Sequence, residues 1–261
     1  MTKEKIYELY ITQNLGSKKI SEILNISPTT VIKLVKKYGF EVKEKKRPVK
    51  YHANHDFFAT WSNDMAYCLG FIAADGHVWK ERPFLNIAVH KQDIKVLEYI
   101  VKNISPTTKI RENKNMVQVC IHSQKIWEDL KRYGISHGKT FNFQIDFDIP
   151  EEFWSDYLRG FFDGDGSIHR KTYKDKINYL VFKSSIVGAC LQPLEYFKNR
   201  LGFGNIRLIR NKYYELGFNQ QETIKLGNLI YKDKDSFRME RKYEKFKLIN
   251  PRIKTKLRFC C

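Results

Sequence analysis

Two acidic residues stand at matching places in a segment that this 261-residue chain contains twice. The first copy, YCLGFIAADG, spans residues 67–76, and the second copy, YLRGFFDGDG, spans residues 157–166. In both copies, two small residues with three positions between them precede an Asp-Gly pair, which holds Asp75 in one copy and Asp165 in the other. Carboxylates are hard oxygen ligands of the kind that Mg²⁺ prefers. The repeat therefore suits a metal-dependent reaction on a substrate with two-fold symmetry.

Each of these acids is predicted to end a helix. Residues 65–74 and 155–164 favour helix formation, and the glycine after each acid supplies a stop signal. Small residues on one face allow two helix backbones to approach closely, which would bring Asp75 and Asp165 together. A helix C-terminus carries partial negative charge, so two carboxylates there repel each other unless cations offset them. A single Asp-Gly pair is ordinarily a turn, but two copies in matched contexts favour the paired site.

The residues after each acid predict two halves with the same order of elements, because apolar spacing alternates between strand and helix periods. In the first half the predicted segments, two hairpins and two helices, are 76–80, 84–90, 93–104, 109–112, 116–122 and 124–133. In the second half the corresponding segments and one further helix are 167–173, 179–184, 191–201, 206–210, 213–218, 222–231 and 238–248. The predicted fold class is α+β, with two pseudo-symmetric αββαββα halves, residues 59–150 and 151–261, that form a saddle.

Residues 1–42 predict a small all-α domain of the helix-turn-helix type. Ser17 and Ser27 are predicted N-caps, Asn25 supplies a left-handed turn residue, and Gly39 is a stop. A three-helix packing module without DNA contact is the alternative. The exposed face of the third helix would present side chains suited to phosphate and base-edge contact, namely Thr29, Thr30, Lys33, Lys36 and Lys37.

The net charge of +18 favours a polyanionic partner, either nucleic acid or an anionic membrane. Residues 1–50 and 232–261 each carry a net charge of +7, and the segment between them carries only +4. Residues 43–58 are predicted to be a basic linker. The longest apolar run is too short to span a bilayer, and no segment has the pattern of an amphipathic anchor. The charge therefore favours nucleic acid over a membrane.

The five cysteines include no CxxC pair, so a zinc site and a disulfide framework are both disfavoured. The N-terminal residues are rich in Lys and Glu and lack the apolar core of a signal peptide. These features predict a reducing compartment. The expected location is the cytoplasm, for a bacterial or phage-encoded protein, or an organelle, and secretion is not expected.

The two repeated segments resemble the LAGLIDADG motif of homing endonucleases, in the single-chain form with two motifs. The resemblance covers residues 60–250. It implies that Asp75 and Asp165 bind the catalytic metals, together with the backbone carbonyl groups of Ala74 and Gly164. Two or three Mg²⁺ ions are expected, with Mn²⁺ as a plausible substitute and Ca²⁺ as a non-catalytic ion.

The resemblance also implies that Lys139 and Lys242 lie near the cleavage centre. They could stabilise developing charge or order water, and simple phosphate contact is an equally good interpretation. The earlier acid of the motif is Asp163 in the second copy, but its counterpart in the first copy is Ala73. We therefore do not count this position as catalytic.

Twisted hairpins fit the major groove of DNA, and alternate residues would point to the bases. Ile110, Ile168, Ile206 and Leu208 are expected to point inward. The outward residues predicted to contact DNA are Trp79, Lys109, Arg111, His169, Lys171, Tyr173, Asn205 and Arg207. The solvated face of an ordinary sheet is the alternative interpretation.

These features predict a monomeric, Mg²⁺-dependent, site-specific endonuclease that acts on double-stranded DNA at a long, imperfectly palindromic site. The resemblance implies cleavage of both strands with short 3′ overhangs. Because we find no intein splice junctions, an intron-encoded or free-standing enzyme is favoured. Two alternatives use the same scaffold: a transcription regulator that only binds DNA, and an RNA-splicing maturase. Regulators of that type have typically lost the motif acids, which this chain keeps.

Overall fold

The chain forms two compact units, Met1–Lys50 and Tyr51–Cys261. The structure is a computed structural model that describes residues 2–42, 52–173 and 179–249, except for the side chains from 170 to 181. Within these ranges, no helix is long and apolar enough to cross a membrane.

The first unit consists of short helices around a small apolar core. Its elements are α1 (Lys3–Tyr7), the π-helical turn η1 (Glu8–Thr12), α2 (Ser17–Leu24) and α3 (Pro28–Lys37). Asn25 has the predicted left-handed conformation, with φ of 50°, and the Ser27 side chain accepts a hydrogen bond from the Thr30 amide. The predicted N-cap role of Ser17 is wrong, because Gly16 takes the cap position and Ser17 is buried in the first turn. The core residues are Ile6, Leu9, Tyr10, Ile20, Val31 and Val35.

Two long helices form the centre of the second unit. They are α4 (Asn63–Asp75), which begins after a Ser62 cap that accepts from the Met65 amide, and α8 (Glu151–Asp165). Both end at the acid, as predicted. The glycine after each acid is not a left-handed stop, since Gly76 and Gly166 have extended backbone. Glycine is required there because a side chain would clash with the preceding turn: a Cβ on Gly76 would lie 2.6 Å from the Ile72 carbonyl oxygen.

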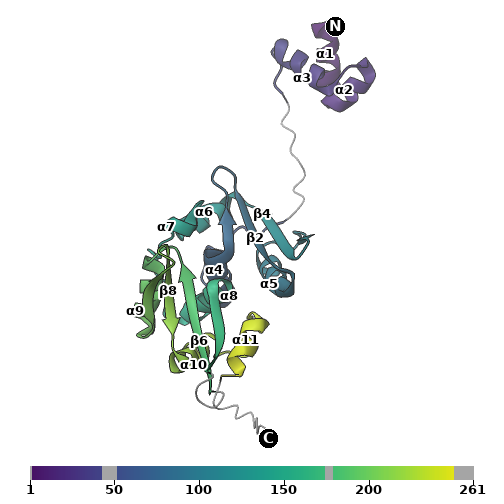
Figure 1. Ribbon diagram of the computed structural model, residues 1–261. Helices are drawn as coiled ribbons and strands as arrows, with labels where there is room; N and C mark the ends of the chain where they lie inside the picture. The colour runs from purple at the N-terminus through teal and green to yellow at the C-terminus, as the bar shows by residue number, and fades with distance from the viewer. Residues whose placement is uncertain (1, 43–51, 174–178, 250–261) are drawn as a thin grey trace. The chain divides into compact units, whose positions relative to one another are not determined.

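The two central helices pack backbone to backbone at their glycines. A Cβ on Gly70 would lie 2.1 Å from the Tyr157 carbonyl oxygen, and one on Gly160 would lie 2.0 Å from the Tyr67 carbonyl oxygen. This reciprocal contact confirms the close approach that the small residues predict. Figure 1 shows α4 and α8 side by side, with β2, β4 and α5 on one side and β6, β8 and α9 on the other.

Each half contributes one antiparallel four-stranded sheet. The first, in the order β1-β2-β4-β3, contains β1 (Gly76–Val78), β2 (Phe84–His90), β4 (Met116–His122) and β3 (Arg111–Asn113). The second, in the order β5-β6-β8-β7, contains β5 (Gly166–Tyr173), β6 (Tyr179–Gly188), β8 (Tyr213–Phe218) and β7 (Asn205–Ile209). The sheets follow directly from α4 and α8, because β1 and β5 begin at the residue after each acid.

Helices cover one face of each sheet and leave the other face exposed. Along β4, for example, Val117, Val119 and Ile121 are buried while Met116 and Cys120 are exposed. The covering helices of the first half are α5 (Ile94–Ile104), preceded by the short η2 (Lys91–Asp93), and α6 (Gln124–Arg132). Those of the second half are α9 (Gln192–Leu201) and α10 (Gln220–Ile230). The last helix of the first half is α7 (Lys139–Asn142), and the last described helix of the second half is α11 (Glu240–Lys247).

Two details of the predicted hairpins are wrong. The strand predicted for residues 109–112 begins only at Arg111, as β3, so Lys109 precedes the strand and does not stand on its face with Arg111. Leu208 was expected to point inward, but it is 56% exposed. It lies on β7, the edge strand of its sheet, where only one neighbouring strand flanks it. Ile168 is buried, and Ile110 and Ile206 pack on the core, as predicted.

The glycine contact between α4 and α8 can be tested by adding one methyl group. We expect Gly160→Ala and Gly70→Ala to destabilise the protein by about 3 kcal/mol or more, because the clash is with backbone that cannot turn aside. Chemical denaturation measures the change. Gly217→Ala is the matched control, since its Cβ would meet nothing nearer than 3.8 Å. Equal stability of the Gly160 and Gly217 variants would contradict the packing described here.

Candidate active site

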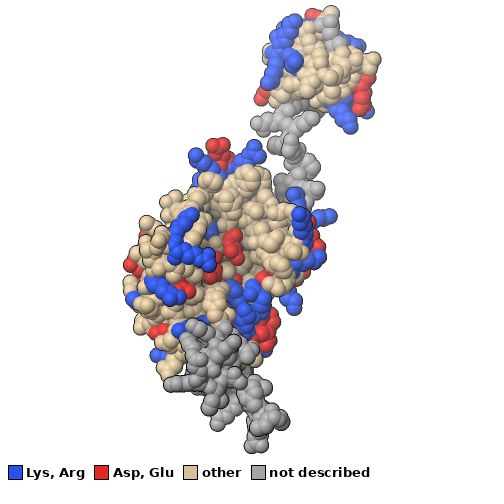
Figure 2. Space-filling model, in the orientation of Figure 1, with Lys and Arg blue, Asp and Glu red and all other residues tan. Residues whose placement is uncertain are grey.

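Asp75 and Asp165 are the last residues of α4 and α8, and both helices end at the same place. The Asp75 carboxylate reaches the second helix, since its Oδ2 lies 3.5 Å from the position that a Cβ on Gly164 would take. Asp75 is exposed to solvent, and Asp165 is partly buried. Figure 2 shows acidic side chains near the middle of this face of the second unit, with basic side chains gathered around them. The structure therefore brings the two predicted acids together.

The two predicted lysines lie on the carbonyl groups at these helix ends. Lys139 Nζ donates to the carbonyl oxygens of Ala73 and Ala74, at 2.7 and 2.6 Å. Lys242 Nζ donates to the carbonyl oxygens of Asp163 and Gly164, at 2.6 and 3.1 Å. These carbonyl groups occupy the same two motif positions in each half. The last carbonyl groups of a helix lack partners within it, so each ammonium group satisfies the end of one central helix.

The carbonyl groups of Ala74 and Gly164, which were expected to bind metal, thus already accept hydrogen bonds from lysine. A carbonyl oxygen has two lone pairs, so a lysine and a cation can share it. Their role as metal ligands stays a prediction.

Burial and mutual repulsion perturb the charges of the site. Burial, and then the nearby Asp75, raise the pKa of Asp165 to about 6, although Lys139 and Lys242 oppose the rise. Although Asp75 as a whole residue stays exposed, desolvation of its carboxyl group by the surrounding protein raises its pKa, and both lysines counteract the rise. Burial lowers the pKa of Lys242 to about 8 and lowers that of Lys139. The two carboxylates are therefore stabilised only in part by the two ammonium groups.

The donor atoms fit a hard divalent cation. Asp75 and Asp165 offer carboxylate oxygens beside main-chain carbonyl groups, an all-oxygen set of the type that Mg²⁺ and Ca²⁺ prefer. Within the described residues no group of three or more His, Cys, Asp and Glu side chains could hold a metal by itself. Remaining ligands would have to come from substrate and water. A cavity of about 310 Å³, lined in part by Ala74, Lys139 and Asp165, adjoins the site on the side of Asp165.

The residues predicted to contact DNA on the second unit are exposed wherever their side chains are described. Asn205, Arg207 and His169 line one hollow of about 560 Å³ on the open face of the second sheet. In it Arg207 pairs with Glu215, and the His169 ring hydrogen-bonds the Ser167 hydroxyl. Trp79, Lys109 and Arg111 are exposed in the first half. The side chains of Lys171 and Tyr173 lie outside the described residues.

On the first unit the predicted contact residues all lie on the open face of α3 or its first turn. All five are exposed: Thr29, Thr30, Lys33, Lys36 and Lys37. The hydroxyl groups of Thr29 and Thr30 hydrogen-bond that of Ser27. The helix-turn-helix role of this unit stays a prediction.

Sequence reasoning missed an ion pair beside the site and discounted one acid. Arg241 donates to both carboxylate oxygens of Asp93, at 3.1 and 3.0 Å, across 148 positions of the chain. Asp163, which we did not count as catalytic, is fully buried and accepts three hydrogen bonds. No local pattern signals the ion pair, whereas the signal for Asp163 was the mismatch with Ala73.

Comparison with solved structures identifies the fold. No protein-family model and no curated protein matches the sequence. The LAGLIDADG meganuclease I-AabMI, solved with uncleaved DNA, matches with a TM-score of 0.52 and 16% identity, over 70% of this chain and 90% of that one. This chain has the LAGLIDADG homing endonuclease fold. The homing endonuclease I-GzeII, in complex with its DNA target, matches with a TM-score of 0.53 and 15% identity, over 73% and 89% of the chains.

A third LAGLIDADG structure, the homing endonuclease I-LtrWI bound to target DNA, matches with a TM-score of 0.52 and 14% identity, over 75% of this chain and 90% of that one. The three matches confirm the α+β fold class predicted from the repeated motif. At such low identity the likeness describes the arrangement of the LAGLIDADG helices and sheets, and residue roles rest on the site geometry.

The raised pKa of Asp165 makes a prediction about stability without metal. The folded protein binds this proton more tightly than the unfolded chain, whose ordinary value is 3.8, so stability falls as pH rises from there to about 6. Above about pH 6 Asp165 is ionised in the folded protein, and the full loss of folding stability is present. We expect Asp165→Asn to stabilise the protein by about 1–3 kcal/mol at pH 8 in chelator and to lose this advantage below pH 4.

Thermal unfolding across this pH range measures the effect, with Asp148→Asn as the control because Asp148 is exposed and lies before α8. An Asp165→Asn protein that is no more stable than the control at pH 8 would show that the two carboxylates do not strain the folded state.

Proposed function

We propose that this protein is a site-specific endonuclease that cuts both strands of DNA with divalent metal ions, Mg²⁺ in the first place. The observation that carries the proposal is the pairing of Asp75 and Asp165 at the meeting ends of α4 and α8, each beside one lysine. An antiparallel duplex has two scissile bonds related by a two-fold axis. Because each half supplies one acid and one lysine, each half could act on one of the two scissile bonds.

The expected chemistry divides between ions and residues. Bound Mg²⁺ would supply Lewis-acid stabilisation of the phosphate and an activated water. Asp75 and Asp165 would hold the ions, and their raised pKa values reflect a site that gains from binding cations. Lys139 and Lys242 would offset charge that develops on the phosphate oxygens. The solved structure of I-SmaMI with uncleaved DNA in the presence of calcium ions, which matches with a TM-score of 0.50, supports a divalent ion at such a site.

The flanking sheets would supply site recognition. Each half leaves one sheet face open, and polar or basic side chains such as Arg111, His169 and Asn205 stand on it. Because the halves differ in sequence, the target is expected to be an imperfect palindrome. One chain holds both halves, so a monomer suffices. The first unit, with the basic face of α3, would add contacts to the DNA backbone.

Removing either acid tests the proposal. We expect Asp75→Asn and Asp165→Asn to lower double-strand cleavage by roughly a hundredfold or more, because each half loses a metal ligand. Binding in Ca²⁺ should stay within about threefold of wild type, since most affinity comes from phosphate contacts. The substrates are sites selected by cleavage of a random DNA library in Mg²⁺.

The exposed Asp148→Asn variant serves as the control and should cut like wild type. Undiminished cutting by either motif variant would reject the assignment of the acids. Binding without any cleavage by wild type in Mg²⁺ or Mn²⁺ would favour a regulator that only binds DNA.

Deleting residues 1–47 tests the first unit. We expect weaker binding and a flatter dependence of affinity on salt, by roughly 0.9 in the logarithmic slope for each phosphate group that the shortened protein no longer neutralises. Fluorescence anisotropy at several salt concentrations measures both. In the full chain, the Lys33→Gln, Lys36→Gln, Lys37→Gln triple variant should reproduce much of the change, because these side chains are exposed. Unchanged affinity in both would leave the unit a packing module.

A further inference from the structure

The C-terminal segment Tyr231–Lys247, which includes α11, packs against both halves of the second unit. We call it the α11 strap. Phe237 stacks on Tyr99 of the first half with ring centroids 3.9 Å apart. Arg241 forms its two hydrogen bonds with Asp93, also in the first half. The strap therefore crosses from the half that contains it to the other one.

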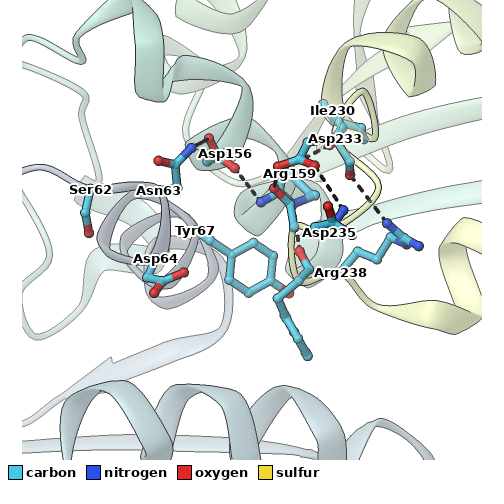
Figure 3. Close-up of polar contacts among 12 residues, drawn as sticks. Ser62, Asn63, Asp64, Tyr67, Asp156, Arg159, Ile230, Asp233, Asp235 and Arg238 are labelled. Carbon is cyan, nitrogen blue, oxygen red and sulfur yellow. Dashed lines mark hydrogen bonds and ion pairs between the residues drawn. The ribbon is translucent and has the colours of Figure 1, made fainter.

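Buried polar side chains of α8 form hydrogen bonds with the backbone of the strap and of the residue before it. The Arg159 guanidinium, paired with Asp156, donates to the carbonyl oxygens of Ile230 and Phe237, at 3.2 and 2.8 Å. Figure 3 shows Arg159 between Asp156 and the chain around Ile230, with Tyr67 of α4 beside it. Four positions further along α8, Asp163 makes the next contacts with the strap.

Asp163 fixes the point where α11 begins. Its Oδ2 accepts from the Met239 amide at 2.7 Å and from the Tyr67 hydroxyl at 3.0 Å, and its Oδ1 accepts from the Tyr231 hydroxyl at 3.1 Å. Met239 is the N-cap residue of α11. The Asp163 carboxylate thus joins α4, α8 and both ends of the chain that leads into α11.

This anchor determines where Lys242 lies. Lys242 follows Met239 by one helical turn, is 5% exposed, and reaches back to the carbonyl oxygens at the end of α8. Two anchors precede it closely in the chain: Asp163 accepts from the amide of Met239, and Arg241 pairs with Asp93. Together they limit how far this turn of α11 can move away from the end of α8.

The first half holds its lysine by other means. Ala73 occupies the position equivalent to Asp163, and Lys139 lies in the four-residue helix α7. The contacts that the structure gives to the backbone of α7 from the other half are weak ones, from Cys190 Sγ to the carbonyl oxygens of Lys139 and Thr140. An apolar residue at this motif position is thus compatible with the helix packing, so the fold itself does not require the acid.

We propose that Asp163 is a positioning residue that holds Lys242 in the second cleavage centre, so that the two centres are secured by different means. The inference rests on the proposed function. It follows that losing Asp163 slows the cleavage of one strand, the same strand that depends on Lys242, and leaves the other strand nearly untouched. The enzyme would then release nicked DNA.

The test compares Asp163→Ala, which copies the first half, with Asp163→Asn. The first measurement needs no cleavage activity. It is the rate at which an amine-reactive acetylating reagent modifies Lys242 in the full-length protein, followed by peptide mass spectrometry. We expect a rise of roughly tenfold in Asp163→Ala, because a buried amide and two hydroxyl groups lose their shared acceptor. Labelling of Lys139 should not change. Asp163→Asn keeps an oxygen for Met239 and Tyr67 and should stay near wild type.

The second measurement resolves the two strands with separate end labels. We expect Asp163→Ala to slow one strand by roughly tenfold and the other by less than about twofold. Lys242→Met identifies which strand belongs to this centre. Arg241→Gln removes the pair with Asp93 at an exposed side chain. It should also speed the labelling of Lys242 and slow one strand, to a smaller degree, and it provides a second test if Asp163→Ala does not fold.

Two results would overturn the inference: unchanged Lys242 labelling in every variant that folds, or equal slowing of both strands, which is what general destabilisation would give. A wild-type protein that binds DNA but cuts neither strand would contradict the proposed function instead. The labelling experiment alone would then still decide whether Asp163 holds Lys242 in place.

Discussion

The backbone contact between α4 and α8 is the constraint on which the second unit depends. Gly70 and Gly160 each face a carbonyl oxygen of the other helix at a distance that no side chain would permit. With the helices this close, their C-terminal ends coincide, and the acids that end them must share one site. The sheets begin at the next residue on each side, so the same contact also fixes where the two open sheet faces lie relative to the acids.

That closeness has an electrostatic consequence. Two helix C-termini and two carboxylates gather negative charge at one point, and burial raises the pKa of Asp165 to about 6. The lysines offset part of this charge by lying on the free carbonyl groups, at the expense of their own protonation, since burial lowers the pKa of Lys242 to about 8. The residual negative charge favours cations. A site strained in this way would gain stability from a bound cation, and perturbed pKa values of this kind occur more often at functional sites.

The sequence predicts those parts of the fold that local spacing encodes. Small residues four apart identified the helix contact, and alternation identified strands such as β2 and β4 because one face of each is buried. It failed where neighbours distant in sequence decide the outcome. Leu208 is apolar yet exposed on an edge strand, Gly76 is required by its own preceding turn, and the Arg241–Asp93 pair joins residues 148 positions apart. The acids of the site were predictable because they end the repeated motif; their anchors were not.

A single chain with two halves can depart from symmetry in a way that two identical chains cannot. In a symmetric dimer, any residue that positions a lysine in one centre must do so in the other. Here Ala73 and Asp163 occupy equivalent places, and the second half has a strap that reaches across to its partner half. The strap joins the halves and carries Lys242, so interactions that stabilise the pairing of the halves also order this lysine. In the first centre Lys139 lies on a short helix instead, and Ala73 offers no carboxylate to anchor it. If the lysines act as proposed, stability and chemistry are linked in the second half and separable in the first.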